Sequence, residues 1–281
     1  MATAGQVWFV TGASSGFGEA LAEAVIEAGG TVMATFRKSG QASDFDAKAS
    51  GRSFGIEMDV TDKRSVDAGI AAAIARFGRI DVLVNNAGYA LRGLVEQVSD
   101  EEAIHQIDTN VLGVLRVTRA ALPYMRERGS GHIMNIASAA GSVGFPMMAH
   151  YAASKHAVVG LSDALSKEVA ALGIKVTSVE PGAFRTKFGS SSMITPEKAA
   201  PGPYAPIVEQ IDASIENFNA IALGDPKKAA LKLLDLAAMD DPPTRLALGD
   251  DALPWITGAL EQRIEEYKQY SELGQGTSFD E

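Results

Sequence analysis

The fold is decided by residues 7–36, which open with the run Val7-Trp8-Phe9-Val10-Thr11-Gly12-Ala13-Ser14-Ser15-Gly16-Phe17-Gly18. The four apolar residues at its start, cut off by Thr11-Gly12, are typical of a buried parallel strand. An amphipathic helix is predicted after the glycines, ending at Gly29-Gly30, and a second strand is predicted over 31–36. Strand, glycine turn, helix and strand within about thirty residues form the first unit of a dinucleotide-binding fold.

The glycines of this turn have a physical role. The backbone must turn sharply and approach a pyrophosphate without a Cβ atom in the way. The start of the helix also presents free N–H groups and the positive end of its dipole to the phosphates. The spacing here is Gly12-x-x-x-Gly16-x-Gly18, which differs from the Gly-x-Gly-x-x-Gly fingerprint. The position of the turn, between a strand and a helix, nevertheless predicts a phosphate site.

Strands and helices alternate along the rest of the chain. One helix begins at the capping box of Ser99 and Glu102 and is predicted to continue to Met125, with Ile104 and Ile107 on its apolar side. No shift in composition and no linker divides the chain, so residues 1–281 are predicted to form a single domain. The pattern predicts an α/β fold, a Rossmann-type doubly wound parallel sheet with helices on both faces. The further strands are predicted over 53–58, 80–84, 131–136, 174–179 and near 245–248.

The C-terminal part departs from this pattern at residues 183–223, where prolines interrupt apolar residues that include Phe188, Tyr204 and Ile207. This segment is either an irregular packing segment or a lid over the substrate. The lid is favoured because the segment follows the carboxyl end of a strand. Asp225-Pro226 predicts the start of a helix. A last helix is expected over about 253–270, and residues 271–281 are expected to form a flexible tail.

The composition excludes several classes of protein. With 46% hydrophobic and 21% charged residues, the 281-residue chain can build a sizeable core. Acidic residues outnumber basic ones, 35 to 25, so binding to nucleic acid or to an anionic membrane is not expected. Cysteine is absent, and the four histidines show no ligand spacing, so no metal site is expected. Without a signal peptide or a membrane span, we expect a cytoplasmic protein.

The candidate chemistry lies in Ser138 and in Tyr151-Ala152-Ala153-Ser154-Lys155. A tyrosine and a lysine four residues apart lie on the same face of a helix. A nearby ammonium lowers the pKa of a phenol, and bringing it from 10 to about 7 requires roughly 4 kcal/mol. The Ser138 hydroxyl would hold a substrate oxygen against the phenol. Taken alone, Tyr-x-x-x-Lys is more often a half-buried ring beside a solvated ammonium.

The positions of the other motifs favour the catalytic interpretation. In doubly wound sheets, ligands bind beyond the carboxyl ends of the strands. Five separate motifs are expected at that edge: Thr11-Gly12, Asp59, Asn85 to Gly88, Ser138 and Pro181-Gly182.

Together these motifs resemble those of the short-chain dehydrogenase/reductase family, and the resemblance covers nearly the whole chain. It implies an oxidoreductase that interconverts a carbonyl and an alcohol by hydride transfer with a nicotinamide cofactor. It also implies a homodimer or homotetramer, paired through the helices at about 101–128 and 151–172. The motifs occur in the family's order: Thr11-Gly12-x-x-x-Gly16-x-Gly18, Asp59, Asn85-Asn86-Ala87-Gly88, Asn110, Ser138, Tyr151-x-x-x-Lys155, and Pro181-Gly182 with Thr186.

The resemblance implies a role for each motif. Tyr151 would be the general acid in reduction and the general base in oxidation, and Lys155 would bind the nicotinamide ribose and lower the pKa of Tyr151. Ser138 would orient the substrate oxygen, and Asn110 would hold a water in a proton relay. The cofactor would be bound by Gly12, Ser14, Ser15, Gly16, Phe17 and Gly18 at the pyrophosphate, Asp59 and Val60 at the adenine, Asn86, Ala87 and Gly88 at the ribose, and Pro181, Gly182 and Thr186 at the nicotinamide.

The choice between the two nicotinamide cofactors depends on the residues after the second strand. NAD-selective sites place a carboxylate there to accept hydrogen bonds from the ribose hydroxyls. Residues 34–38 read Ala-Thr-Phe-Arg-Lys and contain no acid. Arg37 and Lys38 would pair with a 2′-phosphate, so we predict NADP(H). The alternative is that both are solvated surface cations.

The substrate is expected to be a small molecule, a bulky and apolar ketone or aldehyde. This expectation rests on analogy with family members that act on hydroxysteroid- and retinoid-type substrates, and on apolar residues expected near the site. Phe145, Met148 and Phe184 are the main candidates, with Tyr89, Leu91 and Met147, although several would equally serve as core. Two other functions stay open. One is a non-catalytic NADPH-sensing binding protein, and the other is an epimerase or dehydratase on the same scaffold.

Overall fold

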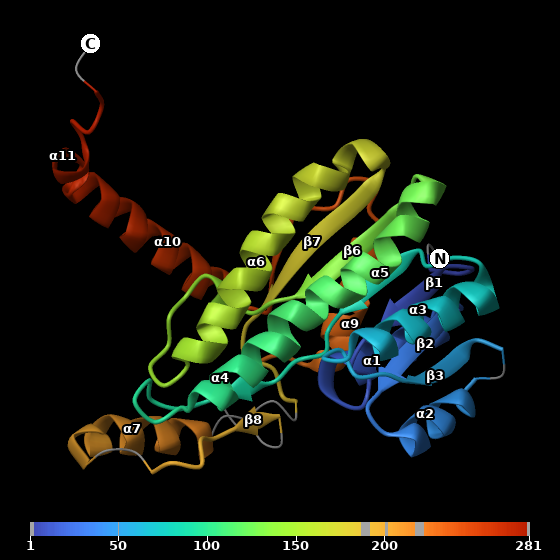
Figure 1. The fold of residues 1–281 in the computed structure, drawn as a ribbon, viewed down its shortest axis with the longest axis horizontal. Coiled ribbons are helices and arrows are strands. Elements are labelled where there is room, and N and C mark those ends of the chain that lie inside the picture. The colour runs from blue at the N-terminus through green and yellow to red at the C-terminus, as the bar shows by residue number, and fades with distance from the viewer. Residues whose placement is uncertain (1–2, 50, 187–191, 200–201, 217–221, 280–281) are drawn as a thin grey trace.

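Seven parallel strands form one sheet through the middle of the molecule (Figure 1). The structure is a computed structural model that describes residues 3–49, 51–186, 192–199, 202–216 and 222–279. In spatial order, the strands are β3 (Ser53–Glu57), β2 (Thr31–Phe36), β1 (Val7–Val10), β4 (Val82–Asn85), β6 (Gly131–Ile136), β7 (Ile174–Pro181) and β9 (Arg245–Leu248).

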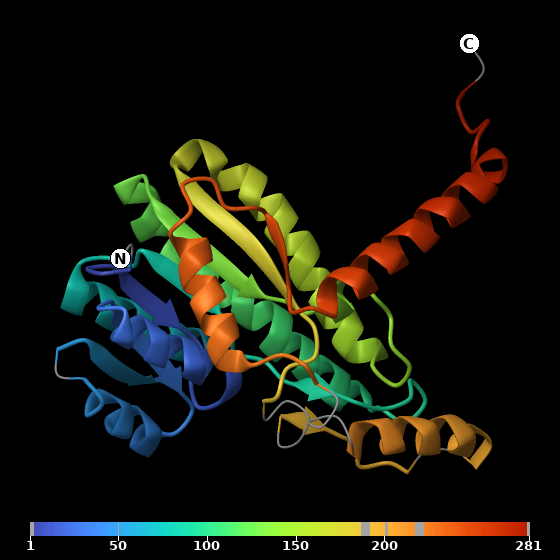
Figure 2. The same cartoon turned by 180° about the vertical axis from the view of Figure 1, so that it is seen from behind.

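Helices cover both faces of the sheet (Figures 1 and 2). Successive residues of β1 point to opposite sides, so Trp8 packs in one half of the core and Phe9 in the other. One face carries α1 (Gly16–Glu27), α2 (Ser39–Asp46) and α9 (Pro226–Ala237). The other carries α3 (Lys63–Phe77), α4 (Asp100–Ile107), α5 (Gly113–Arg128) and α6 (Ala149–Val169).

The predicted doubly wound parallel sheet is therefore confirmed, and it forms a single domain. Of the helices described so far, α2 has no counterpart in the sequence-based prediction. The order of the strands reverses between β1 and β4, where the chain first winds outward to β3 and later outward to β9. In such sheets, ligands bind in the crevice at this reversal, beyond the carboxyl ends of the strands.

The helix predicted from Ser99 to Met125 is broken into three parts. The capping box is present: the Ser99 hydroxyl accepts from the Glu102 N–H at 3.2 Å, and the Glu102 carboxylate accepts from the Ser99 N–H at 2.8 Å. Between α4 and α5, the wider π-helix η1 (Asp108–Leu112) changes the rotational phase. The prediction that Ile104 and Ile107 pack inward is wrong, because both are exposed and Gln106 is buried instead.

Residues 183–223 contain more regular structure than predicted. The two-residue strand β8 (Met193–Ile194) pairs in parallel with β5 (Ala90–Leu91), and α7 (Ala205–Glu216) follows the short 3-10 helix η5 (Gly202–Tyr204). Such a short strand leaves no alternation that the sequence pattern can reveal. Phe188 and Pro201 lie outside the described residues. The role of this segment as a lid stays a prediction.

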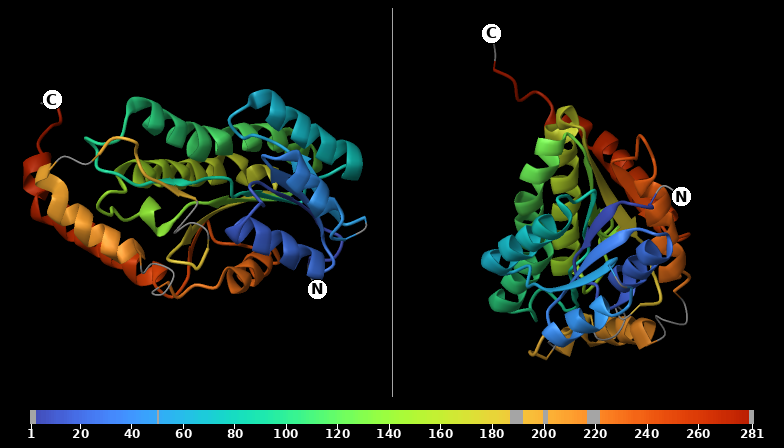
Figure 3. Two further views of the ribbon diagram at one scale, coloured as in Figure 1. Left: turned by 90° about the horizontal axis from the view of Figure 1, so that it is seen from below. Right: turned by 90° about the vertical axis from the view of Figure 1, so that its right-hand side faces the viewer.

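The C-terminal part contains α9, which packs on the sheet, and two helices that extend beyond it. Asp225 caps α9 as predicted, accepting a hydrogen bond from the Lys227 N–H at 2.8 Å. After β9, the helix α10 (Ala252–Gln269) projects away from the sheet and ends in the short helix α11 (Ser271–Gly274) (Figures 2 and 3). The described part of the chain contains no helix with the length and apolar character needed to cross a bilayer.

Candidate active site

The glycine turn between β1 and α1 forms one end of the site. Gly12 and Gly16 have φ of +68° and +61°, in the left-handed region that favours glycine. A Cβ atom on Gly12 would lie 2.8 Å from the Cα of Ala87, so the turn passes closely against the loop after β4. The turn therefore presents bare backbone at the N-terminus of α1, which suits a pyrophosphate.

Gly18 has a different role from the other two glycines. A Cβ atom there would lie 2.5 Å from both Asn86 Nδ2 and the carbonyl oxygen of Gly12. The Asn86 side chain donates to the carbonyls of Thr11 and Gly12 at 2.9 and 3.0 Å. Gly18 thus makes room for the side chain that joins the glycine turn to the β4 loop.

Asn110 lies on η1, and its side chain is buried. Its Nδ2 donates to the carbonyl oxygen of Tyr89 at 2.9 Å and to the Ser154 hydroxyl at 3.1 Å. Its Oδ1 accepts from the Tyr89 N–H at 3.1 Å. The buried amide therefore fixes the loop after β4 against the helix that carries Tyr151 and Lys155.

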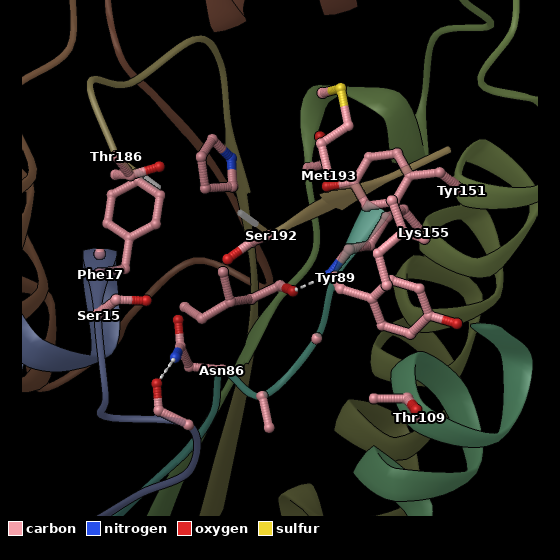
Figure 4. Close-up of a pocket in the computed structure, with 18 of the residues that line it drawn as sticks. Ser15, Phe17, Asn86, Tyr89, Thr109, Tyr151, Lys155, Thr186, Ser192 and Met193 are labelled. Carbon is pink, nitrogen blue, oxygen red and sulfur yellow. Dashed lines mark hydrogen bonds between the residues drawn. The ribbon is translucent and has the colours of Figure 1, made fainter. Parts of the chain in front are cut away.

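Ser138, Tyr151 and Lys155 lie close together and line one wall of the same pocket as the glycine turn. Tyr151 and Lys155 lie beside one another on α6 (Figure 4), with the Lys155 Nζ 5.7 Å from the centre of the phenol ring. That Nζ donates to the carbonyl oxygen of Ile136 at 2.7 Å. The Ser138 and Tyr151 side chains share a hydrogen bond.

The pKa of the Tyr151 phenol differs from the sequence-based prediction. Burial raises it to about 12, although the hydrogen bond with Ser138 acts in the lowering direction. Burial also lowers the pKa of Lys155 to about 8. Desolvation of the charged forms therefore outweighs the attraction that the sequence suggests between the ammonium and the phenolate. The phenol is protonated at neutral pH.

A pocket with a volume of about 960 Å³ connects the glycine turn with this wall. Its volume lies near the upper end of the range for ligand sites, roughly 300 to 1,000 Å³. Of the predicted site residues, all line the pocket except Gly18 and Asn110, which lie behind it. The residues predicted from five separate motifs are thus brought together in one cavity.

The end of the pocket that lies away from Tyr151, at the carboxyl ends of β2 and β3, is polar. Arg37 and Lys38 are exposed there, and Asp59 accepts hydrogen bonds from the Thr61 N–H and hydroxyl at 2.8 and 2.7 Å. Partial burial acts to raise the pKa of Asp59, but these hydrogen bonds and the charge of Arg37 keep it below its ordinary value. A carboxylate and two cations therefore face the same end of the cavity.

The end near Tyr151 is apolar. Phe145, Met148 and Met193 pack in one cluster with Tyr151, whereas Phe184 is buried in edge contact with Phe17, their ring centres 4.8 Å apart. Leu91 and Met147 do not line the pocket. Sequence reasoning missed several lining residues because they come from α7 and α10, whose placement no local pattern reveals: Ile211, Ser214, Ile215 and Trp255.

The strand order and the pocket at its reversal define a doubly wound, Rossmann-type fold. A sequence model described as short chain dehydrogenase matches residues 6–195. The chain is 37% identical to "Oxidoreductase BOA17" of Botryotinia fuckeliana over 95% of this chain and 97% of that protein. It is 35% identical to "3-ketodihydrosphingosine reductase" of Bacteroides thetaiotaomicron over 87% and 88%. The chain therefore belongs to the short chain dehydrogenase family and is an oxidoreductase.

Solved structures agree with this assignment. A short-chain dehydrogenase from Streptomyces avermitilis superimposes with a TM-score of 0.90 at 41% identity, covering 98% of this chain and 100% of that one. Nicotinamide cofactors are present in more distant neighbours. A serine dehydrogenase complexed with NADP+ has a TM-score of 0.75 at 28% identity, covering 86% and 94%. A 3-ketoacyl-(acyl-carrier-protein) reductase from Brucella melitensis complexed with NADH has 0.74 at 27%, covering 89% and 99%.

Proposed function

We propose that this protein is an NADP(H)-dependent oxidoreductase that interconverts a bulky, apolar carbonyl compound and its alcohol, with Tyr151 as the general acid and base. The observation that carries the proposal is the convergence of Ser138, Tyr151 and Lys155 on the same cavity as the glycine turn. That cavity offers a phosphate site at one end and a proton donor at the other.

The residues around the cavity suit a nicotinamide dinucleotide. The bare backbone of Gly12 and Gly16 and the N-terminus of α1 would hold the pyrophosphate. Arg37 and Lys38 would pair with a 2′-phosphate. Lys155, buried beside Tyr151, would donate to the nicotinamide ribose, and Pro181, Gly182 and Thr186 would border the nicotinamide.

The protein's own part in the reaction is to manage the proton. A nicotinamide cofactor, when bound, would supply the hydride chemistry at the substrate carbon. The Ser138 hydroxyl holds the substrate oxygen, and the Tyr151 phenol donates its proton to that oxygen during reduction. The raised pKa of Tyr151 favours the protonated form, as a donor requires. A positive charge on Lys155 stabilises the phenolate that remains.

The apolar end of the pocket supports a bulky substrate. Phe145, Met148 and Met193 surround the phenol with apolar surface, which favours binding of an apolar substituent over a polar one. The relationship to a 3-ketodihydrosphingosine reductase points the same way, since that name describes a ketone reductase. We therefore propose a ketone or aldehyde with a large apolar substituent.

The proposed proton donor is tested with Tyr151→Phe, which removes only the hydroxyl. We expect kcat for NADPH-dependent reduction of an apolar ketone to fall by roughly 10²- to 10⁴-fold, because general acid catalysis typically contributes that much. The dissociation constant for NADPH, measured by fluorescence titration, should stay within about twofold, since the glycine turn and the cationic end are intact. Tyr267→Phe, an exposed tyrosine on α10 outside the pocket lining, is the matched control.

Retention of most of the activity in Tyr151→Phe would argue against this proton donor. The same measurement separates the other two functions. A non-catalytic NADPH-sensing protein would bind NADPH but oxidise none with any carbonyl compound. An epimerase or dehydratase would convert its substrate without net consumption of cofactor. We keep the cytoplasmic location as a prediction, supported by the acidic charge and the absence of cysteine.

A further inference from the structure

The start of α10 is anchored to the loop that follows β7. Asp251 Oδ2 accepts a hydrogen bond from the Ala183 N–H at 2.8 Å. A Cβ atom on Gly182 would lie 2.0 Å from Asp251 Oδ1, so only glycine leaves room for this carboxylate. Gly182 and Ala183 also line the pocket. Ala183 therefore links the start of the C-terminal helix to the candidate active site, and Gly182 leaves the room that this contact requires.

A second anchor fixes α10 further along the helix. Arg263 Nη2 donates to the carbonyl oxygen of Ser142 at 3.0 Å. The Ser142 hydroxyl in turn donates to the buried carboxylate of Glu180, at the end of β7, at 2.9 Å. Ser142 directly follows the 3-10 turn η2 (Ala139–Gly141), which begins after Ser138 and packs against α10. The part of α10 up to Arg263 is thus held against the segment that carries Ser138.

Trp255 lies between these two anchors and lines the pocket. Its ring contacts Phe145 edge to face, with ring centres 5.7 Å apart and an angle of 71° between the planes. Phe145 belongs to the apolar cluster around Tyr151, with Met148 and Met193. Trp255 nevertheless keeps 41% of its surface exposed. A large aromatic surface at the pocket wall, on an anchored helix, is therefore left for a ligand to cover.

We infer that Trp255 is a specificity-determining residue, which contacts the apolar substituent of a carbonyl substrate held at Ser138 and Tyr151. This inference rests on the proposed function and adds to it the element that selects the substrate by size. A long aliphatic chain or a fused ring system covers the Trp255 and Phe145 rings, and removal of that apolar surface from water favours binding. A small ketone has no substituent to do so. The protruding C-terminal helix is therefore part of the substrate site.

The test compares Trp255→Ala with the unaltered enzyme on a series of 2-alkanones of increasing chain length, with NADPH. We expect kcat/KM for the longest members to fall roughly tenfold, mainly through KM, because uniform binding is lost. Propanone, the shortest, should be unaffected. Tyr267→Ala removes an aromatic ring from the same helix outside the pocket lining, where 72% of the side chain is exposed, and should change neither. Equal loss at all chain lengths, loss at none, or the same loss in Tyr267→Ala would overturn the inference.

A second measurement does not depend on turnover or on the folding of Trp255→Ala. The chain contains two tryptophans, and the other, Trp8, is fully buried in the core. Adding a long-chain 2-alkanone to the enzyme with NADP+, which cannot reduce it, should change the tryptophan emission in the unaltered protein and not in Trp255→Phe. An identical response in both proteins would overturn the inference. By contrast, NADPH binding without turnover of any carbonyl compound by the unaltered protein would overturn the proposed function.

Discussion

Arg37 and Lys38 are the residues on which the proposed preference for NADP(H) depends. Both are exposed at the carboxyl end of β2 and line the polar end of the pocket. Phe36, directly before them, is buried and packs on Phe45 with ring centres 5.5 Å apart. Phe36 also lines the pocket, but an acidic residue there would lose the packing on Phe45, whereas position 37 is exposed and lines the pocket without such a core contact.

The prediction at this position concerns Arg37→Asp. A carboxylate repels a 2′-phosphate and accepts hydrogen bonds from ribose hydroxyls, so we expect the ratio of kcat/KM for NADPH to that for NADH to fall at least tenfold. Steady-state kinetics with both cofactors and one ketone provide the measurement. Lys228→Asp on α9, exposed and outside the pocket lining, is the matched charge reversal. An unchanged ratio in Arg37→Asp would mean that Arg37 is only a solvated surface cation.

At the glycines of the first turn, the sequence predicts the residue type but not the structural reason for it at each position. From the sequence, all three glycines are explained by the need for the backbone to come close to a pyrophosphate. In the structure, Gly12 and Gly16 adopt the left-handed conformation, whereas Gly18 makes room for Asn86 Nδ2. Glycine was predictable at each position, but the Asn86 side chain that requires it at Gly18 comes from the loop after β4, which is distant in sequence.

Among the secondary structure elements, the π-helix η1 has a specific effect on the site, because it determines the direction in which Asn110 faces. A continuous α-helix from Ser99 to Met125 would keep one rotational phase, and the sequence pattern assumes that phase. The π-helix changes it, so that Asn110 faces inward and bonds both Tyr89 and Ser154. π-helical turns occur frequently at functional sites, in agreement with the position of η1 behind the pocket.

The strand β6 contains a histidine that should make stability depend on pH. His132 is buried, and its Nε2 lies 3.0 Å from the hydroxyl of Thr177, which itself donates to the carbonyl oxygen of Pro243 at 2.7 Å. The Nε2 atom therefore carries the hydrogen, and Nδ1 has no partner among the described residues. Burial, and secondarily the charge of Lys175, lower the pKa of His132 to about 4.

The sign of the pH effect follows from this lowered value. Below its ordinary pKa of 6.5, the unfolded chain binds a proton at His132 that the folded protein does not bind until about pH 4. The free energy of unfolding should therefore fall as the pH is lowered from about 6.5 to about 4. Urea unfolding at several pH values measures this slope, and His132→Asn should reduce it by about one proton. An equal slope in both proteins would show that His132 does not contribute.

At the scale of the whole molecule, the apolar residues exposed on α4 and η1 favour assembly. Ile104 is 67% exposed, and Ile107 and Leu112 are also exposed on the same stretch. This region overlaps the helix at about 101–128, which the family resemblance implies for pairing together with the helix at about 151–172. We therefore propose that this face, together with α6, pairs two copies of the chain.

The prediction is that Ile104→Glu weakens self-association, because a charge in a dimer interface must be desolvated. Light scattering coupled to size-exclusion chromatography should give a lower mass than for the unaltered protein at equal concentration. Leu231→Glu replaces an exposed leucine on α9, on the opposite face of the sheet, and should leave the mass unchanged. If Leu231→Glu lowers the mass and Ile104→Glu does not, the interface lies on the other face.

The sequence by itself determined the doubly wound sheet and about half of the residues that line the pocket. It could do so because strand and helix periods, glycine turns and the ends of parallel strands are local features, and because the topology brings the carboxyl ends of all parallel strands to one edge. Only the tertiary structure decided the phase of the helix at Asn110, the pKa of the buried Tyr151, and the presence of Trp255 in the pocket. Each of these depends on contacts or burial between segments distant in the chain, which no local pattern encodes.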